Sequence, residues 1–330
     1  MDTPAAKPQM IQSFGFAVSK AGKAVPIEVE PAGDLKAVPA GGYRWIHLQG
    51  SLEALGEAVE SHELDDITRS ALTAGETRPR CSAHGDGAII VLRGVNLNNG
   101  AAPDDMISLR IWAEKDRIIS CGIRPLKALE DVVAMLRSDR APRSGAELIA
   151  AFALRLADRA EPVVADLNEA VDSIEEVIAS EDTGDARRLL ADVRRSAISL
   201  RRYMLPQRDA LTTFEVEGFA WVTKDSRSYL REAIDRIMRL CEELDSIRDR
   251  TQVVHDQVSD ARAERMNNQM FVLTIVSAFF LPIGFVTGLL GINVGGLPLA
   301  ENPFGFWLTC GGLVAVLLAE YLLFKKMKLF

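Results

Sequence analysis

The segment from residue 288 to residue 298, which reads GLLGINVGGLP, has the clearest chemical capacity in this sequence. Glycines let backbones approach closely, and at a helix end they free carbonyl oxygens from intrahelical hydrogen bonds. Those carbonyls carry partial negative charge, and Asn293 adds a neutral amide oxygen beside them. Several copies around one axis would form a ring of oxygens that receives a cation or its hydration shell. The same residues also fit a simple turn between two helices, with Asn293 as its left-handed cap.

Two apolar runs lie on either side of Asn293. The first covers residues 271–291 without a charge, and the second covers residues 304–319 and continues past Glu320 to residue 324. A hydrocarbon core of roughly 30 Å needs about 20 helical residues, which both runs provide. We therefore expect two transmembrane helices, at 271–291 and 304–324, with residues 292–303 as the loop between them.

The charges beside the two runs predict how they are oriented. No Lys or Arg occurs between residues 266 and 324, whereas Arg262 and Arg265 precede the first run and the basic tail, residues 325–330, follows the second. Because cationic flanks stay on the cytoplasmic side of a membrane, we expect both termini in the cytoplasm and the loop outside. The N-terminus has no cationic and apolar leader, which agrees with a cytoplasmic soluble part.

Composition argues against several classes of function. The 46 Asp and Glu residues outnumber the 38 Lys and Arg residues, and the resulting net charge of −8 does not suit a nucleic-acid binder. The four cysteines form no C-x-x-C pair, so neither a disulfide framework nor a thiolate zinc cage is expected. The chain has no P-loop, GxGxxG, HExxH or GxSxG motif, and we do not expect an enzyme.

Residues 1–143 predict a mixed α/β domain at the start of an α+β chain. Short runs rich in β-branched and aromatic residues are bounded by glycine and asparagine turns. Short helices are expected near residues 52–61 and 65–74. The predicted strands are 12–18, 43–49, 87–93, 106–113 and 117–122.

The rest of the soluble part predicts long helices. Residues 144–224 fit a helical hairpin with apolar residues at spacings of three and four, and Pro206 is expected to kink or divide its second helix. From residue 225 a heptad-like apolar stripe runs straight into the first apolar run. One helix over 225–291 would have 67 residues and a length of about 100 Å at 1.5 Å per residue. We expect such a stalk to pack against copies of itself.

A Gly-x-Asn tripeptide at the outer end of the first of two C-terminal spans, here Gly291-Ile292-Asn293, resembles the signature of the CorA superfamily of divalent-metal transporters. The Val-Gly-Gly that follows is similar to the zinc-transporting ZntB branch. Further segments of the chain also resemble that branch, so the resemblance extends over nearly all of it: residues 45–48, 76–80, 92–97, 201–208 and the basic tail.

This resemblance implies a homopentamer in the inner membrane of a bacterium, with a cytoplasmic α/β domain and a funnel of stalk helices. Gly291, Ile292 and Asn293 would form the outer entrance, with Asn293 touching a hydrated metal ion. Glu301 either concentrates cations at that mouth or is an ordinary loop residue. The implied cargo is Zn²⁺, with uptake coupled to protons, and no tightly bound cofactor is expected.

The sequence is also compatible with two functions other than zinc transport. Ile292 stands where the best-known magnesium members carry Met, and together with the loop at 294–300 it counts against a Mg²⁺ or Co²⁺ channel without establishing zinc. A membrane-anchored scaffold is an alternative from another class. It would need no ring of oxygens, so Asn293→Ala would leave its activity intact.

Counting back from Asn293 at helical spacing gives the residues expected to line the pore. The larger ones would narrow it into a gate that excludes water, while the small ones also fit plain helix packing. They are Met270, Leu273, Ser277, Leu281, Gly284 and Gly288.

Below the membrane, Asp245 and His255 lie on the stripe expected to face the funnel. His255 fits a relay or proton-sensing group, and fits a solvated stalk histidine better. Glu320 is expected to reach the inner interface or to pair with the lysines one turn later. The pair Cys81-x-x-His84 has too few neighbours for a four-coordinate metal site.

Overall fold

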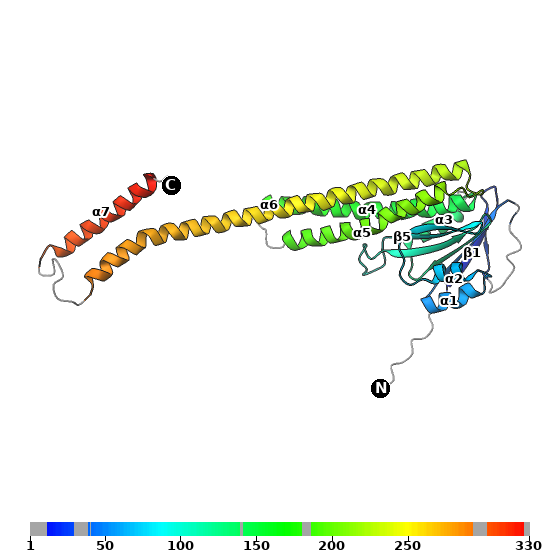
Figure 1. The fold of residues 1–330 in the computed structure, drawn as a ribbon, viewed down its shortest axis with the longest axis horizontal. Helices are drawn as coiled ribbons and strands as arrows, with labels where there is room; N and C mark the ends of the chain where they lie inside the picture. The colour runs from blue at the N-terminus through cyan, green and yellow to red at the C-terminus, as the bar shows by residue number, and fades with distance from the viewer. Residues whose placement is uncertain are drawn as a thin grey trace, which may run out of the picture. The chain divides into compact units, whose positions relative to one another are not determined.

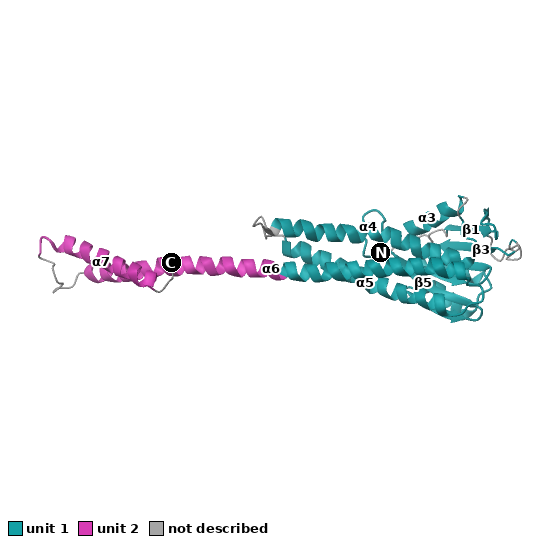
Figure 2. Cartoon of the chain, turned by 90° about the horizontal axis from the view of Figure 1, so that it is seen from above, with its two compact units in different colours: residues 1–255 teal, residues 256–330 magenta. Residues whose placement is uncertain are grey.

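The structure is a computed structural model, and it describes residues 12–29, 39, 41–138, 141–179, 186–292 and 302–326. The chain divides into two compact units, residues 1–255 and residues 256–330 (Figure 2). Each unit has its own architecture, and helix α6 contributes residues to both.

The first unit is built around one seven-stranded sheet with the order β2-β1-β3-β7-β6-β5-β4. Strands β3 and β7 are parallel, and every other neighbouring pair is antiparallel. The central strands are rich in Ile, Val and Trp, which pack well on a pleated surface. The strands are β1 (Gln12–Val18), β2 (Ala24–Ile27), β3 (Tyr43–Gln49), β4 (Arg80–His84), β5 (Gly87–Gly94), β6 (Ile107–Ala113) and β7 (Arg117–Gly122).

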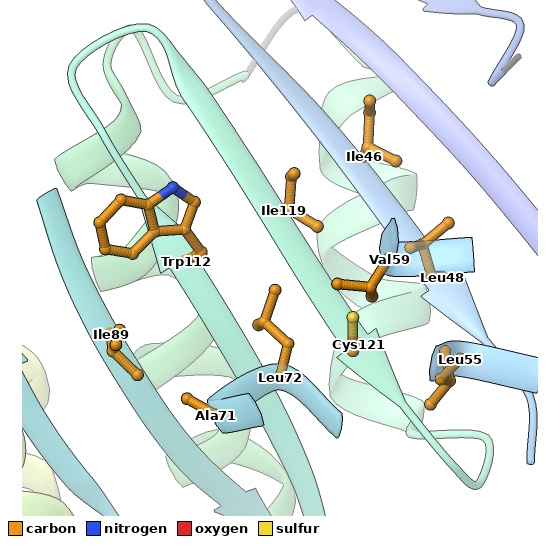
Figure 3. Packing of buried hydrophobic residues seen from close by; sticks show 10 residues of the cluster. All are labelled: Ile46, Leu48, Leu55, Val59, Ala71, Leu72, Ile89, Trp112, Ile119 and Cys121. Carbon is orange, nitrogen blue, oxygen red and sulfur yellow. The ribbon is translucent and has the colours of Figure 1, made fainter. Parts of the chain in front are cut away.

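One face of the sheet is covered by two short helices, α1 (Leu52–Glu60) and α2 (Asp66–Thr73) (Figure 1). Each begins after a side-chain cap: Ser51 accepts from the N–H of Ala54, and Asp65 accepts from Ile67 and Thr68. Figure 3 shows the apolar cluster between these helices and the sheet. Its buried members are Ile46, Leu48, Leu55, Val59, Ala71, Leu72, Ile89, Trp112, Ile119 and Cys121.

The other face packs against α4 (Gly145–Ala179) and α5 (Ala186–Val216), and α3 (Lys127–Leu136) packs against α4. Trp45 of β3 meets Phe152 of α4 edge to face, with ring centroids 5.2 Å apart. At Gly94 of β5, a Cβ would lie 2.5 Å from the Leu156 side chain of α4, so this helix packs closely on the strand. The long helices are thus held directly on the sheet.

Helix α6 (Lys224–Leu290) is anchored to α4 in the first unit. Arg236 and Arg250 of α6 form ion pairs with Asp158 and Asp172 of α4, at 2.5 and 2.6 Å. The two arginines are 14 residues apart on α6, and their two partners are 14 residues apart on α4, in the same direction along the chain. Helices α4 and α6 therefore run parallel, with matching heptads side by side. Most of the apolar stripe predicted for α6 is buried, including Leu230, Ile237, Leu244, Ile247, Val254 and Val258.

Helix α5 contacts a neighbouring stripe of α6 and runs antiparallel to it. Arg194 of α5 donates a hydrogen bond to Gln252, at 2.5 Å, and Arg201 pairs with Asp245, at 2.6 Å. From the first contact to the second, the residue number rises by seven on α5 and falls by seven on α6, which is the pattern of antiparallel helices. Arginines on α5 and α6 therefore fix the register of all three long helices.

The second unit contains the rest of α6 and helix α7 (Gly305–Lys326). Each helix has a stretch long and apolar enough to cross a membrane. No residue in either stretch is fully buried within the chain. Phe279 of α6 meets Phe324 of α7 with ring centroids 5.4 Å apart. The chain therefore combines an N-terminal α/β domain, a long helix and two candidate transmembrane helices, as the sequence predicted.

Three features differ from the sequence-based expectation. The edge strands β2 and β4 were not predicted, because β2 is four residues long with Pro26 inside it and β4 has no buried residue to mark a pattern. Of the two effects expected of Pro206, division of the helix is wrong, because α5 is continuous from Ala186 to Val216, while a kink stays a prediction. Pro162 likewise lies inside the continuous α4.

Candidate functional site

The first part of the candidate site is the end of α6. The N–H of Gly291 donates to the carbonyl oxygens of Thr287, at 2.9 Å, and Gly288, at 3.2 Å. This shared hydrogen bond tightens the last turn, as helix ends commonly do. Ile292 is 46% exposed. Asn293 and Glu301, the predicted oxygen donors of the entrance, lie outside the described residues, and their roles stay predictions.

The six predicted pore-lining residues are all exposed in the single chain, and they share one stripe of α6. The larger ones are Met270, Leu273 and Leu281, which are 64%, 66% and 74% exposed. The residues of α6 that are partly covered, such as Ala278 and Phe279, lie on the side that meets α7. The predicted stripe therefore lies on a different side of α6 from the residues that α7 covers. Exposure does not separate a pore side from a lipid side, so the pore assignment stays a prediction.

Asp245, predicted to face a funnel, lies at the contact between α6 and α5. Its Oδ1 is 2.6 Å from Arg201 Nε and 3.2 Å from Arg248 Nη1, and its side chain is 33% exposed. The carboxylate is thus already compensated by two guanidinium groups of its own chain. A role for Asp245 in binding a cation would have to compete with both arginines.

His255 also lies on the α5 side of α6. Together with Thr251 it lines a cavity of about 370 Å³, whose other walls come from Leu190, Ala191, Arg194, Arg195 and Ile198 of α5. The histidine is half-buried. Its orientation toward a funnel stays a prediction.

A row of carboxylates at a repeat of seven lies on the exposed face of α6. Asp235, Glu242 and Asp249 are seven residues apart, and all three are exposed. The heptad spacing places them on one side of the helix, away from the buried stripe. The signal was present in the sequence, as acidic residues at a repeat of seven, but the sequence alone does not say which side α4 and α5 cover.

The thiol and imidazole groups of the described residues lie apart from one another, as Cys81 and His84 illustrate. Cys81 and His84 lie three residues apart on β4, so they point to opposite faces of the strand. His84 Nε2 instead pairs with Asp65, at 3.0 Å. Burial raises the pKa of the Cys241 thiol to about 11. Within the described ranges, no three His, Cys, Asp or Glu side chains are grouped to hold a metal ion.

Glu320 of α7 was expected to reach the inner interface or to pair with a lysine; its reach to the interface stays a prediction, and the pairing is not seen among the described residues. Its Oε2 atom is buried and has no hydrogen-bond partner in the described part of the chain. The residue is half-buried, within a helix that is apolar enough to cross a membrane. Carboxylates in such helices are costly and commonly functional.

Comparison with known proteins identifies the family of this chain. Residues 40–326 match the family model described as "CorA-like Mg2+ transporter protein". The chain belongs to the CorA-like family. The divalent cation transporter CmaX of Pseudomonas aeruginosa is 38% identical to this CorA-like chain over 287 residues, which are 86% of each protein. The zinc transport protein ZntB of Pectobacterium carotovorum is 32% identical over 283 residues, again 86% of each.

A solved structure shows the same fold over the whole chain. The structure of the full-length CmaX protein matches this CorA-like chain with a TM-score of 0.83 and 33% identity, and it covers 99% of this chain and 100% of that one. The family is one of transporters, which agrees with the expectation from the motifs that the chain is not an enzyme.

Three sequence segments that supported the family resemblance meet around Arg93 of this CorA-like chain. The backbone N–H of Arg93 donates to Gln207 Oε1, at 2.6 Å, and its guanidinium lies 4.3 Å from the ring centroid of Tyr203. Its Nη2 donates to the Thr77 carbonyl, at 2.7 Å. These residues join α5 to the edge of the sheet, so this part of the family pattern has a structural role.

Proposed function

We propose that this chain transports divalent metal cations, Zn²⁺ in particular, across the bacterial inner membrane through an axial pore made by five copies. In this assignment both termini are cytoplasmic and the loop at 292–303 is outside. The first unit forms the cytoplasmic funnel, α6 lines the pore, and α7 surrounds it. Membership of a transporter family and two candidate transmembrane helices support the proposal.

The continuity of α6 carries this proposal. One unbroken helix of 67 residues bears an exposed row of carboxylates in the first unit and ends next to Gly291 and Ile292. A ring of such helices would place Asp235, Glu242 and Asp249 along one aqueous path. Carboxylates along a confined path raise the local concentration of cations. The same helices would bring Asn293 together at the outer mouth.

The metal ion would pass in hydrated form. The described residues offer no group of three metal-ligating side chains, so a dehydrated protein cage for zinc has no support there. Amide and carbonyl oxygens at Gly291, Ile292 and Asn293 would contact the hydration shell, and Glu301 would attract the ion to the mouth. Met270, Leu273 and Leu281 would narrow the path below it, while Ser277, Gly284 and Gly288 leave space.

Proton coupling would involve Glu320. Its buried and unpartnered Oε2 lies in a candidate membrane helix, where carboxylates commonly serve in proton relays. A carboxyl group that takes up and releases a proton within the bilayer would let a pH gradient drive the metal.

A Mg²⁺ or Co²⁺ channel is the second candidate. The similarity to CmaX, which is named for divalent cations in general, favours a broader cargo than zinc. Ile292, which replaces the Met of the best-known magnesium members, counts against this second candidate without establishing zinc.

Flux measurements on the full chain in liposomes test both candidates. We expect Zn²⁺ uptake to exceed Mg²⁺ and Co²⁺ uptake, to rise with an inward proton gradient, and to fall by about tenfold or more in Asn293→Ala, which removes the amide oxygen. Leu289→Ala, a change on the same helix end, is the control. Zinc flux that ignores both Asn293→Ala and the pH gradient would contradict the mechanism, and no flux of any divalent cation would favour a scaffold.

A further inference from the structure

A cavity of about 710 Å³ lies in the first unit, where α5 turns into α6 beside the end of the sheet. Three connections line it: the β4–β5 turn, the β6–β7 turn and residues 217–221 between the two helices. Its volume lies in the range of small-molecule sites, roughly 300–1,000 Å³. The proposed transport mechanism does not use this cavity.

Aromatic rings form one wall of the cavity. Phe219 and Trp221 are half-buried, with ring centroids 5.5 Å apart, and both pack on the buried Phe214. The indole N–H of Trp221 donates to the backbone oxygen of Asp86, at 3.1 Å, which fixes the ring against the β4–β5 turn. Ordered aromatic faces attract ammonium groups and pack well against methylene chains.

The rest of the lining is acidic. Four carboxylates and one lysine surround the rings, namely Asp86, Glu114, Asp116, Glu217 and Lys115. Burial raises the pKa of Glu114, and the like charges of Asp116 and Asp86 raise it further, against an opposing effect of Arg117. Arg117 directs Nη2 to the carbonyl oxygen of His62. The negative charge at the cavity is therefore only partly compensated.

The arrangement of the carboxylates does not suit a bare metal ion. In the described parts of the chain, no three of them gather at a metal-binding distance. Separated carboxylates beside an aromatic wall instead match a ligand with several positive charges joined by apolar linkers. We propose that this cavity binds a linear polyamine, whose ammonium groups meet the carboxylates and whose methylene groups lie on Phe219 and Trp221.

Binding would hold the start of α6 in place. Residues 217–221 belong to the connection from which α6 begins, and the other two walls belong to the sheet. A polyamine that touches all three connections would resist their separation. It would therefore stabilise the first unit by an amount that rises with the logarithm of the free polyamine concentration above its Kd, whatever metal the chain carries.

The test measures binding of spermidine to the full chain in nanodiscs, by calorimetry and by thermal unfolding. We expect saturable binding that weakens by about tenfold or more in Asp116→Asn/Glu217→Gln, a loss of about 1.4 kcal/mol. The matched control, Glu57→Gln/Glu60→Gln, removes two exposed carboxylates from α1 and should bind as the parent does. Phe219→Ala should weaken spermidine more than it weakens putrescine, which has a shorter chain to lay on the ring.

Magnesium chloride at equal ionic strength separates a site from general charge screening. We expect Mg²⁺ to compete poorly, because the cavity lacks a cluster of metal ligands. Equal competition by Mg²⁺, equal losses in both double variants, or no saturation by spermidine would each overturn the proposal. Tighter binding of a lysine-rich peptide than of any free polyamine would overturn the assignment to a small molecule.

Discussion

Arg201 of α5 and Asp245 of α6 lie with Nε and Oδ1 only 2.6 Å apart. The two groups are close, yet their orientation does not make a hydrogen bond, so the attraction between them is chiefly electrostatic. Arg248 approaches the same oxygen at 3.2 Å. The charge of Asp245 is therefore compensated within one chain, at a place where α5 and α6 are held in register.

Breaking this pair should loosen the first unit slightly. We expect Arg201→Gln and Asp245→Asn each to lower the free energy of unfolding by about 1 kcal/mol, since both side chains are about one-third exposed and such pairs are weak. The double variant should lose less than the sum of the two, because each single variant already removes the pair. Denaturant unfolding followed by the fluorescence of the buried Trp45 and Trp112 measures these values. Additive losses would show that the two residues are not coupled.

The exposed carboxylates of α6 should affect transport and not stability. We expect Asp235→Asn/Glu242→Gln to reduce zinc flux several-fold at low ionic strength, because the funnel would concentrate cations less. The effect should shrink at about 1 M salt, where charges separated by more than about 3 Å are largely screened. Flux in liposomes at two ionic strengths checks this expectation.

A matched variant controls for net charge in this experiment. Glu53→Gln/Glu60→Gln removes the same number of exposed carboxylates from α1, and it should leave flux unchanged. Equal flux in both double variants would mean that the carboxylate row does not face the ion path.

The sequence predicted the parts of the fold that depend on one repeating pattern. Leu244 and Ile247 are buried because a spacing of three and four puts them on one side of α6, whatever their neighbours are. Whether Asp245 faces α5 or solvent depends on where α5 packs on α6. The spacing of apolar residues in the sequence does not give the position of α5. Strand β4 was missed for a related reason, since an edge strand with no buried residue has little hydrophobic pattern.

The candidate site was predictable to a smaller extent. Glycine at 288 and 291 marks a helix end by its own chemistry, and α6 does end at Leu290. The buried oxygen of Glu320 was not predicted, because three lysines close by in the sequence suggested a pairing that the described residues do not make. The assembly of several chains around an axis leaves no mark on a single chain and stays a prediction.

His47 should make the first unit less stable in mild acid. Burial lowers the pKa of this histidine from 6.5 to about 3, and its Nε2 has no partner among the described residues. Above pH 6.5 the contribution of His47 to stability is fully present. Below it the unfolded chain takes up a proton that the folded chain refuses, so stability falls by about 1.4 kcal/mol per pH unit until pH nears 3.

The slope of stability against pH isolates this effect. In His47→Gln one proton-binding group is lost, so stability should fall less steeply than in the parent between pH 6.5 and 4.5. Burial also lowers the pKa of His62, helped by Arg117, so a residual slope of the same sign should remain. Unfolding by denaturant at several pH values gives both slopes, and identical slopes would contradict the assignment. If His47→Gln lowers the free energy of unfolding by the same amount at every pH, the slope does not change, so the comparison of slopes still holds.

Substitution of Glu320 should abolish proton coupling and leave metal permeation intact. Its Oε2 is buried without a hydrogen-bond partner in the described part of the chain, inside a helix that is apolar enough to span a membrane. Glutamine keeps the shape and cannot exchange a proton, so Glu320→Gln should retain zinc flux down a zinc gradient and lose the stimulation by a proton gradient. Glu301→Gln, the control, should change the dependence on zinc concentration and keep that stimulation, because in the proposed orientation this carboxylate lies outside and acts on cation capture. Liposome flux with zinc and proton gradients imposed independently measures both responses. If Glu320→Gln still responds to the proton gradient as the parent does, the coupling proton is carried by another group.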